Sequence, residues 1–440
     1  MHITLTHLLL SLLAGIGVII LLTARFKIHA FFALFIACFI TGLSVQMPVE
    51  QILNTMKDGF GHIMSSLALI IVLGTTLGVL LEHTGSTKVM AGFIMKKTGE
   101  RRAPVAMSIT GFIVGLPIFC DSGYIVLSGL AKSLAKRSSV SIAVIAVSLA
   151  TGLYSVHCLI PPHPGMSAAA ANLHIEFGKL ILTGILIAIP AAIAGYLWAN
   201  YAGKKIPYIA IKEEVDEGSN TKLPTVAKAF LPVIVPILLI ALKSFLSMND
   251  GSNNVLHQIL NISGEPVIAL TIGVLLALTN TSRGTSFTHV LQEAAEKAGG
   301  ILVIIGAGGA FGAILAATNP AAHFNGLEAS GRIAILFPFL IAFILKTAQG
   351  SSTVAIITTS SLIQPLLPAF GMDSEPGRIL AALSMGAGSM MISHANDAYF
   401  WVIAKFSGLD MKTMLRVYSI ATLLMGLVTL LMVYLASFIL

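Results

Sequence analysis

Apolar runs of about 20 residues, each long enough to cross a bilayer as a helix, recur along the chain between short polar segments. The N-terminal run has neither a charged segment before it nor a small-residue cleavage site after it, so we expect it to remain as the first span. The pattern predicts uninterrupted membrane-spanning helices at 7–23, 29–46, 62–82, 179–200, 227–247, 264–279, 300–319 and 418–439.

Two further spans, 140–175 and 379–410, are interrupted by polar residues. The first contains SVHCLIPPHPG, in which three prolines fall within four residues. Proline cannot continue a helix because it lacks an N–H group and its ring clashes with the preceding turn. The second contains ISHANDAYF (392–400). A chain break at membrane depth is tolerated only where protein or water covers it, so both breaks are predicted to line a buried site.

Two apolar stretches, 104–131 and 333–366, are too long for one crossing and too short for two crossings with a turn. The first lies between the basic segments KKTGERR and AKSLAKRSS, and both of these favour the cytoplasmic side. A stretch that enters and leaves on one side is a re-entrant hairpin. We predict two such hairpins, with polar tips at PIFCDSGY (117–124) and AQGSST (348–353).

The two halves of the chain resemble each other. ALIIVLGTTLGVLLEHTG (68–85) aligns with LVIIGAGGAFGAILAATN (302–319), and in both halves a hairpin and an interrupted span follow. Each half holds five crossings and one hairpin, and an odd number of crossings turns the second half upside down relative to the first. The predicted fold is therefore an all-α polytopic membrane protein of two inverted repeats, 1–202 and 229–440, joined by a charged cytoplasmic linker, 203–228.

Composition supports this class and argues against others. Of the residues, 56% are hydrophobic and 10% are charged, whereas soluble domains have roughly 25% charged residues. The alternating strand pattern of an outer-membrane barrel is not seen. The three cysteines, Cys38, Cys120 and Cys158, lie in apolar segments and do not suggest disulfides. The net charge of +7 fits basic cytoplasmic loops and does not indicate a nucleic-acid partner.

The lysines and arginines set the predicted orientation. If both termini lie on the outer, periplasmic side, about nineteen basic residues fall in inner loops and five in outer loops, which is the bias that the positive-inside rule requires. Lys297 is counted among the inner-loop residues. Lys346 and Lys405 fall inside predicted membrane segments.

The polar residues at the four breaks are candidate ligands of a small anionic substrate. A broken helix presents free N–H groups at one end and free C=O groups at the other, which suit an anion and a cation respectively. The local alternative is that these side chains cap helix ends or bond to freed carbonyl groups. The candidate substrate-binding residues are Ser122, Gly123, His157, His163, Lys346, Gly350, Ser351, Ser352, Thr353, His394 and Asn396.

Asp121 and Asp397 are the candidate proton carriers. A carboxylate in hydrocarbon is costly, and a carboxyl group shielded from water holds its proton more readily. For Asp121 the alternative is a permanent ion pair with Lys346, and Lys346 could instead pair with a substrate carboxylate or extend to the membrane surface. Because an imidazole titrates near neutral pH, the alternative proton carriers are His157, His163 and His394.

At these breaks the chain resembles the gluconate permease family of bacterial secondary transporters. The matching segments are ARFKIHAFFAL, IIGAGGAF, GSSTVAIIT, HCLIPPHPG and SHANDAYFW, of which the last two are specific. The resemblance implies import of gluconate or a related small hydroxy-acid or sugar-acid anion, by proton symport across the bacterial inner membrane. It also implies the wider ion-transporter architecture, which has scaffold and transport parts and often forms a homodimer.

The chain departs from that family next to the inferred site. Family members usually have an aromatic residue, Glu and an aliphatic residue where this chain has Cys120, Asp121 and Ser122, and often Arg where Lys346 stands. The shorter acid leaves more room, and lysine is a point charge where arginine is a bidentate fork. The substrate can therefore differ from gluconate. A smaller hydroxy-acid, a different sugar acid or a D-amino acid such as D-serine stays open.

Sodium coupling is the alternative within transport. It would use hydroxyl, amide and carbonyl groups at 351–353, Ser393 and Asn396. The paired hairpins favour alternating access over a channel. No GxxxxGK phosphate loop followed by Ser or Thr occurs, which argues against an ATP-driven pump.

An intramembrane metalloenzyme is a more distant alternative. Zinc could in principle be bound by Cys120, His157, Cys158 and His163. However, no HExxH segment occurs, and Cys158 directly follows His157, which makes shared ligation awkward. We therefore expect no enzymatic activity, no cofactor and no bound metal.

Overall fold

The computed structural model describes residues 5–99, 102–206, 223–247, 255–281, 287–318 and 331–439. Most of the predicted linker, 207–222, lies outside these described residues. Within them, all regular secondary structure is helical, as predicted. Six of the described helical stretches are long and apolar enough to cross a membrane, and several shorter apolar helices accompany them.

Apart from α4 (Ser86–Thr98) in the first half and α11 (Val255–Ser263) and α18 (Met411–Met414) in the second, the helices of the two halves follow the same order: two helices, one long helix, a pair of helices, a broken helix and a final span. The first half contains α1 (Leu5–Ile20), α2 (Ala30–Ser44), α3 (Val49–His83), α4 (Ser86–Thr98), α5 (Ala103–Gly115), α6 (Cys120–Ser138), α7 (Ile142–Leu159), α8 (Pro164–Asn172) and α9 (Phe177–Gly203). The second half contains α10 (Val226–Ser247), α11 (Val255–Ser263), α12 (Pro266–Leu278), α13 (Phe287–Ala317), α14 (Leu336–Gln349), α15 (Ser352–Ile363), α16 (Glu375–Met390), α17 (Ala398–Ser407), α18 (Met411–Met414) and α19 (Ile420–Ala436).

The predicted breaks all interrupt helices in the structure. Helices α5 and α6 pack against each other on either side of one break, as α14 and α15 do. The proline-rich segment separates α7 from α8, and residues 391–397 separate α16 from α17. Whether the two helix pairs enter and leave the membrane on one side stays a prediction.

Several predicted boundaries were wrong. Helix α3 begins at Val49 rather than at 62, and α13 begins at Phe287 rather than at 300. Both helices start with a polar, amphipathic segment that falls below the hydropathy of a membrane span but keeps good helix formers. The first helix pair likewise extends to Ser138, and the amphipathic α4 was not predicted.

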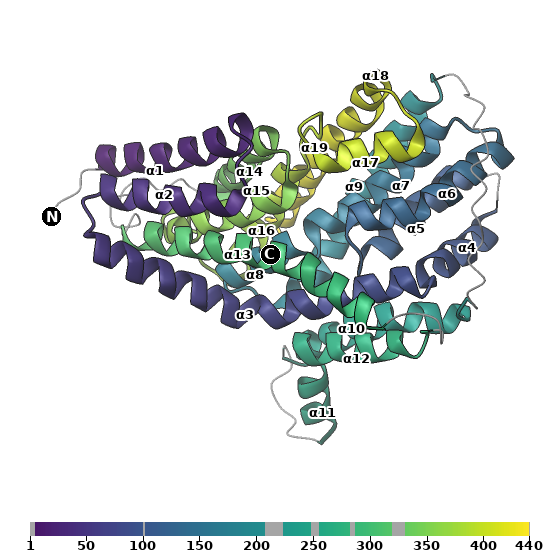
Figure 1. The fold of residues 1–440 in the computed structure, drawn as a ribbon, viewed down its shortest axis with the longest axis horizontal. Coiled ribbons are helices and arrows are strands. Elements are labelled where there is room, and N and C mark those ends of the chain that lie inside the picture. Colours follow the sequence, from purple (N-terminus) through teal and green to yellow (C-terminus); the bar gives the residue numbers. More distant parts are fainter. Residues whose placement is uncertain are drawn as a thin grey trace.

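Each half packs its broken helix against the helix pair of the other half. Helix α8 contacts α15, where Asn172 donates a hydrogen bond to Ser360 Oγ at 2.7 Å. Helix α17 contacts α6, where the hydroxyl groups of Tyr124 and Ser407 are hydrogen bonded. The long helices α3 and α13 pack along each other beside this centre (Figure 1). This exchange brings the four breaks together.

Two glycines at matching positions of the repeated segment allow close packing. A β-carbon at Gly78 of α3 would lie 3.0 Å from the carbonyl oxygen of Pro117, in the break between α5 and α6. A β-carbon at Gly312 of α13 would lie 3.0 Å from Cβ of Ser361 in α15. Because a β-carbon at either place would make a contact tighter than an ordinary one, the glycines let each long helix approach a helix pair closely.

Candidate functional site

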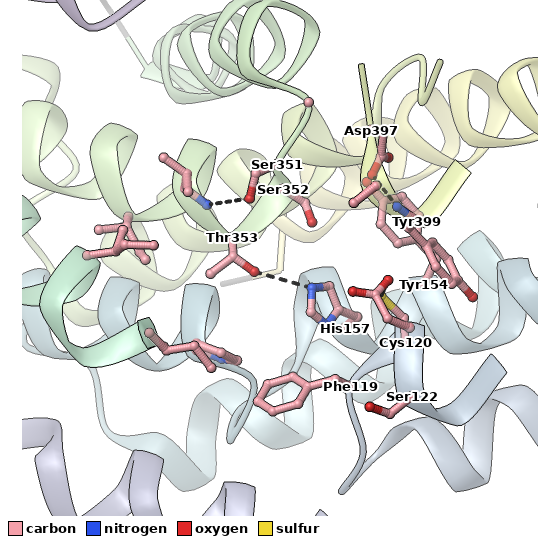
Figure 2. Close-up of a pocket in the computed structure, with 18 of the residues that line it drawn as sticks. Phe119, Cys120, Ser122, Tyr154, His157, Ser351, Ser352, Thr353, Asp397 and Tyr399 are labelled. Carbon is pink, nitrogen blue, oxygen red and sulfur yellow. Dashed lines mark hydrogen bonds between the residues drawn. The ribbon is translucent and has the colours of Figure 1, made fainter. Parts of the chain in front are cut away.

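A cavity of about 380 Å³ lies where the breaks meet (Figure 2). Its wall contains residues from both halves of the chain. The predicted site residues that line it are Asp121, Ser122, His157, Gly350, Ser351, Ser352, Thr353 and Asp397. Further lining residues include Phe119, Cys120, Tyr154, Pro164, Tyr399 and, from α13, Lys297, Ile301 and Ile304.

Four helices, α6, α8, α15 and α17, begin at the wall of this cavity. Local sequence explains three of these starts. Pro164 is the first residue of α8, where its missing N–H is no loss. Ser351 accepts a hydrogen bond from the backbone N–H of Val354 at 3.3 Å, and Asp397 accepts one from that of Tyr399 at 2.9 Å. Because a helix N-terminus carries partial positive charge, four of them make the cavity suitable for an anion.

Asp121 lies in the first turn of α6 and lines the cavity. The contact that its carboxylate receives from a described side chain is weak, from the thiol of Cys120 at 3.7 Å. A thiol is a poor hydrogen-bond donor. Asp121 is therefore a carboxyl group that faces the cavity without a strong side-chain hydrogen bond from the described residues.

Asp397 is held quite differently. Its Oδ2 atom lies 2.6 Å from Nζ of Lys346 and also accepts a hydrogen bond from the hydroxyl of Ser393. With the backbone N–H of Tyr399, three donors thus satisfy this carboxylate. The Asp397 carboxylate is therefore engaged by protein donors, whereas that of Asp121 faces the cavity.

Lys346 is 1% exposed and does not line the cavity. Its ammonium group bonds Asp397 and also donates to the carbonyl oxygen of Gly350 at 2.8 Å. The Tyr154 ring lies 5.8 Å from the ammonium nitrogen. The alternative that Lys346 forms an ion pair with Asp121 is therefore wrong, because Asp397 is the carboxylate that Lys346 contacts.

Besides Lys346, four of the predicted substrate ligands do not line the cavity: Gly123, His163, His394 and Asn396. His163 bonds the carbonyl oxygen of Gly115 at 2.7 Å, and Asn396 donates to that of Thr347 at 2.6 Å. These are the local roles that were considered as alternatives.

His157 links the two halves at the cavity. Its Nε2 atom lies 3.3 Å from the Thr353 hydroxyl, as Figure 2 shows. The ring stacks on Tyr154 with centroids 6.3 Å apart, and Nδ1 has no hydrogen-bond partner among the described residues. An imidazole in this position can bond a polar ligand through its second nitrogen.

Lys297 was missed as a site residue. Its position in the sequence predicts an inner loop, but it lies in α13 and lines the cavity. Its Nζ atom is 2.8 Å from Oε1 of Glu293 and 3.6 Å from Oε2 of Glu82. Gly299 and Gly300 follow Lys297 closely in the sequence. Because glycine is a poor helix former, this pair does not predict that the helix already begins before Lys297.

A second cavity, of about 290 Å³, lies further along the same helices. Helix α13 contributes Lys297 to the first cavity and Gly312 to the second, and α15 and α8 likewise contribute to both. Between the cavities α8 and α15 are in close contact, since a β-carbon at Gly165 would lie 3.3 Å from Cα of Thr353. The polar residues that line the second cavity include Asp58, His62, Asn172, His174 and Gln364.

The zinc set considered from the sequence is not assembled. His157 and His163 lie in contact, with ring centroids 4.9 Å apart. Together with the two cysteines they do not form a cluster of metal-ligand spacing in the described part of the chain. One group with such spacing does occur there, at the ends of α3 and α13, and is considered below.

Residues 7–439 match the sequence model of the family described as GntP family permease. The chain is 33% identical to a gluconate permease of Pseudomonas aeruginosa, over 98% of this chain and 97% of that protein. It is 31% identical to the D-serine transporter DsdX of Escherichia coli, over 98% of each.

Two solved transporter structures have a similar fold. The YdaH transporter of Alcanivorax borkumensis superimposes with a TM-score of 0.64 at 13% identity, covering 88% of this chain and 89% of that one. MtrF of Neisseria gonorrhoeae, described as illuminating a class of antimetabolite efflux pumps, gives 0.62 at 13% identity, covering 89% and 85%. At this identity the likeness shows the fold alone: a helical, polytopic membrane architecture.

Proposed function

Because this chain belongs to the GntP family of permeases, we propose that it imports gluconate or a related small hydroxy-acid or sugar-acid anion by proton symport. It is a multi-pass membrane transporter and not an enzyme. The observation that carries the proposal is one cavity at which four helix N-termini, suited to an anion, and the carboxyl group of Asp121, a candidate proton carrier, lie together.

The position of Asp121 offers a reason why binding of the anion is coupled to binding of a proton. An ionised carboxylate about 5 Å from a bound anion repels it by roughly 3 kcal/mol at an effective dielectric constant of 20, which is about a hundredfold in affinity. Protonation removes that repulsion. The cavity therefore binds the anion more tightly when Asp121 is protonated than when Asp121 is ionised.

The two cavities support transport by alternating access. They lie in succession along α8, α13 and α15 and are separated by the close α8–α15 contact at Gly165. We propose that the first cavity holds the substrate in a state open to the cytoplasm and that the second belongs to the periplasmic route. This assignment uses the orientation predicted from the basic residues, with both termini outside.

The remaining architectural predictions form part of the same proposal. Residues 1–202 and 229–440 are two inverted repeats, and the helix pairs are re-entrant hairpins that lower their tips into the membrane. The matching element order of the halves supports this arrangement. The membrane is the bacterial inner membrane, and a homodimer is the expected assembly.

Sodium coupling is less favoured by the contacts at the second hairpin tip. Of the groups that would coordinate sodium, the Ser393 hydroxyl already donates to Asp397 and the Asn396 amide to the carbonyl oxygen of Thr347. Next to them, Lys346 donates to the carbonyl oxygen of Gly350. The Lys346 ammonium thus occupies a place between a carbonyl and the Asp397 carboxylate that a metal cation would otherwise suit. Because the Lys346 ammonium group already supplies a positive charge at this place, we propose the proton and not sodium as the coupling ion.

D-serine is the second candidate substrate. The relative named a D-serine transporter covers nearly the whole chain at an identity close to that of the gluconate permease. The shorter Asp121 and the acidic groups around the cavity could accommodate the ammonium group of an amino acid. A sugar acid would instead rely on the hydroxyl groups at 351–353.

Uptake into proteoliposomes tests the function directly. We expect radiolabelled gluconate to accumulate under an inward proton gradient and not under an inward sodium gradient alone. Unlabelled sugar acids, small hydroxy-acids and D-serine added as competitors would rank the substrates. Accumulation driven by sodium alone would refute proton symport, and competition by D-serine but not by sugar acids would move the substrate to the amino-acid class.

Lys297→Gln is expected to weaken substrate binding by roughly tenfold, because it removes a charge-assisted contact of about 1.5 kcal/mol or more to a substrate carboxylate at the cavity wall. The amide keeps most of the side-chain volume and can still bond Glu293. The measurement is the substrate concentration that half-saturates thermal stabilisation of the purified protein.

Lys297→Arg serves as the conservative variant and should retain most of the affinity. Lys412→Gln, at an exposed position of α18, serves as the matched control and should leave it unchanged. If Lys297→Gln binds substrate like the unmodified protein, Lys297 serves only its ion pairs with Glu82 and Glu293.

A further inference from the structure

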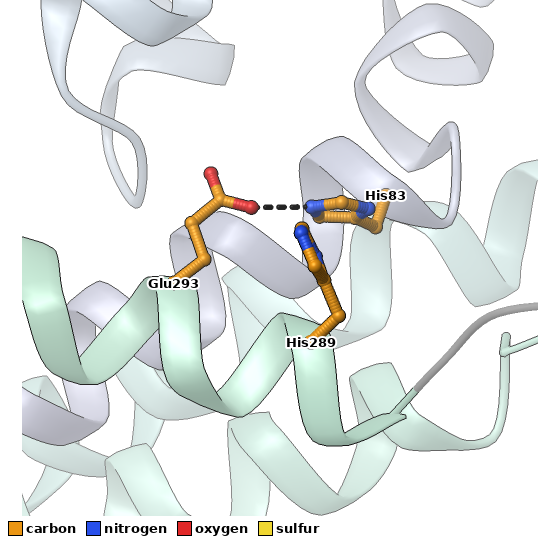
Figure 3. Close-up of side chains that lie close together, drawn as sticks. All are labelled: His83, His289 and Glu293. Atoms are coloured by element: carbon orange, nitrogen blue, oxygen red, sulfur yellow. Dashed lines mark hydrogen bonds and ion pairs between the residues drawn. The ribbon is translucent and has the colours of Figure 1, made fainter.

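His83, His289 and Glu293 converge at the end of α3 and the beginning of α13 (Figure 3). Each offers one ligand atom, and these three atoms all lie within 4.8 Å of one another. One pair, Nε2 of His83 and Oε2 of Glu293, is 2.8 Å apart. No part of the proposed transport cycle uses the two histidines.

We propose that these three residues form a transition-metal site of the zinc class. Two imidazoles and one carboxylate are a ligand set that zinc uses, with metal–ligand bonds of about 2.0–2.1 Å and ligand atoms roughly 3.4 Å apart in a tetrahedron. The spacing in the structure, with every pair within 4.8 Å and one pair at 2.8 Å, is compatible with that value. Side-chain rotation alone can therefore bring the three atoms to bonding distance.

The backbone already fixes two of the ligands relative to each other. His289 and Glu293 are four residues apart on α13, so they project from the same face one turn apart. His83 is the last residue of α3, and it supplies the third ligand from a different helix. Because α3 and α13 pack along each other, the site would join two long helices at one end.

The hydrogen bond between His83 and Glu293 marks where the ion would lie. A metal would replace the proton shared by these two atoms, as metals generally do when they bind imidazole and carboxylate ligands. The neighbouring cation does not occupy this position: Lys297 contacts the other oxygen of Glu293, Oε1, at 2.8 Å. Glu82, 3.6 Å from Lys297, offsets the charge of that ammonium group.

The donor set also predicts which ions bind. Imidazole ligands favour Zn²⁺, Cu²⁺ and Ni²⁺, whereas Mg²⁺ and Ca²⁺ require oxygen ligands. His83 and Glu293 have side chains about one third exposed, which leaves room for a water molecule as the fourth ligand and for entry of the ion.

The test is zinc binding to the purified, metal-stripped full-length protein, by isothermal titration calorimetry with metal analysis after desalting. We expect one Zn²⁺ per chain and a rise in the melting temperature that Mg²⁺ does not cause. His289→Ala should lower the zinc affinity at least roughly tenfold. His289→Cys, which restores a zinc ligand, should recover the affinity.

His174→Ala is the matched control, since it removes a histidine that lies near another histidine, His62, at the second cavity. Zinc binding should be unchanged in this variant. The proposal is overturned if the unmodified protein binds no zinc, if His289→Ala binds it as well as the unmodified protein does, or if His174→Ala is the variant that loses it. None of these outcomes bears on gluconate uptake, so the site and the proposed function stand or fall separately.

Discussion

Replacing Asp121 with asparagine is expected to abolish proton-driven accumulation of substrate. The amide keeps the size of the side chain and its place in the first turn of α6, but it has no proton to release. Substrate can then bind and dissociate on both sides without moving a proton. Uptake into proteoliposomes under an inward proton gradient should fall to simple equilibration across the membrane.

The same variant should still exchange substrate. Counterflow, in which labelled substrate enters liposomes preloaded with unlabelled substrate, needs binding and alternating access but no net proton movement. We expect Asp121→Asn to retain counterflow, which would show that it is inserted and folded. Asp373→Asn, at an exposed position, is the matched control and should accumulate substrate normally. Normal accumulation by Asp121→Asn would reject Asp121 as the proton carrier.

Substrate affinity should fall as pH rises in the unmodified protein. At low pH Asp121 is protonated and does not repel the anion; as the pH increases, the carboxylate ionises and the repulsion returns. The Asp121→Asn variant should keep the low-pH affinity throughout. Substrate-induced thermal stabilisation, measured over a range of pH in both proteins, checks this. An equal pH dependence in the two would place the titrating group elsewhere, with His157 the next candidate at the cavity wall.

Much of the fold could be predicted because the bilayer imposes strong rules on the sequence. Apolar runs show where helices cross, and three prolines within four residues cannot lie inside a helix. Polar residues in otherwise apolar stretches marked all four breaks. The family resemblance agreed with this interpretation, and the comparisons confirmed the family.

The rest depended on information that one-dimensional patterns do not contain. Hydropathy finds the part of a helix that lies in lipid, but not where that helix ends in water or along the protein surface. This is why the starts of α3 and α13 were misplaced and why Lys297 was assigned to a loop. Likewise, a lysine in an apolar segment requires a partner, but the sequence does not say which acid. Asp121 and Asp397 were both available, and the three-dimensional packing selected Asp397.

The partner of Lys346 changes what its removal should do. If Lys346 contacted the substrate, its removal would weaken substrate binding. Instead, Lys346 bonds the buried carboxylate of Asp397 and the carbonyl oxygen of Gly350, at the tip between α14 and α15. Lys346→Met keeps much of the volume but leaves Asp397, which is 5% exposed, without its counter-ion. We expect the free energy of unfolding to fall by about 3–5 kcal/mol, measured by thermal or chemical unfolding in detergent.

A second substitution should reverse much of that loss. In Lys346→Met with Asp397→Asn no buried charge remains, and asparagine can still accept the backbone hydrogen bond from Tyr399 that begins α17. The double variant should therefore be more stable than Lys346→Met alone, which is the expected behaviour of a buried ion pair whose desolvation cost is high. Lys405→Met, at an exposed position of α17, is the control and should change stability by less than about 0.5 kcal/mol. If Lys346→Met were as stable as the unmodified protein and instead lost affinity for substrate, the ammonium group would act on the substrate and not on Asp397.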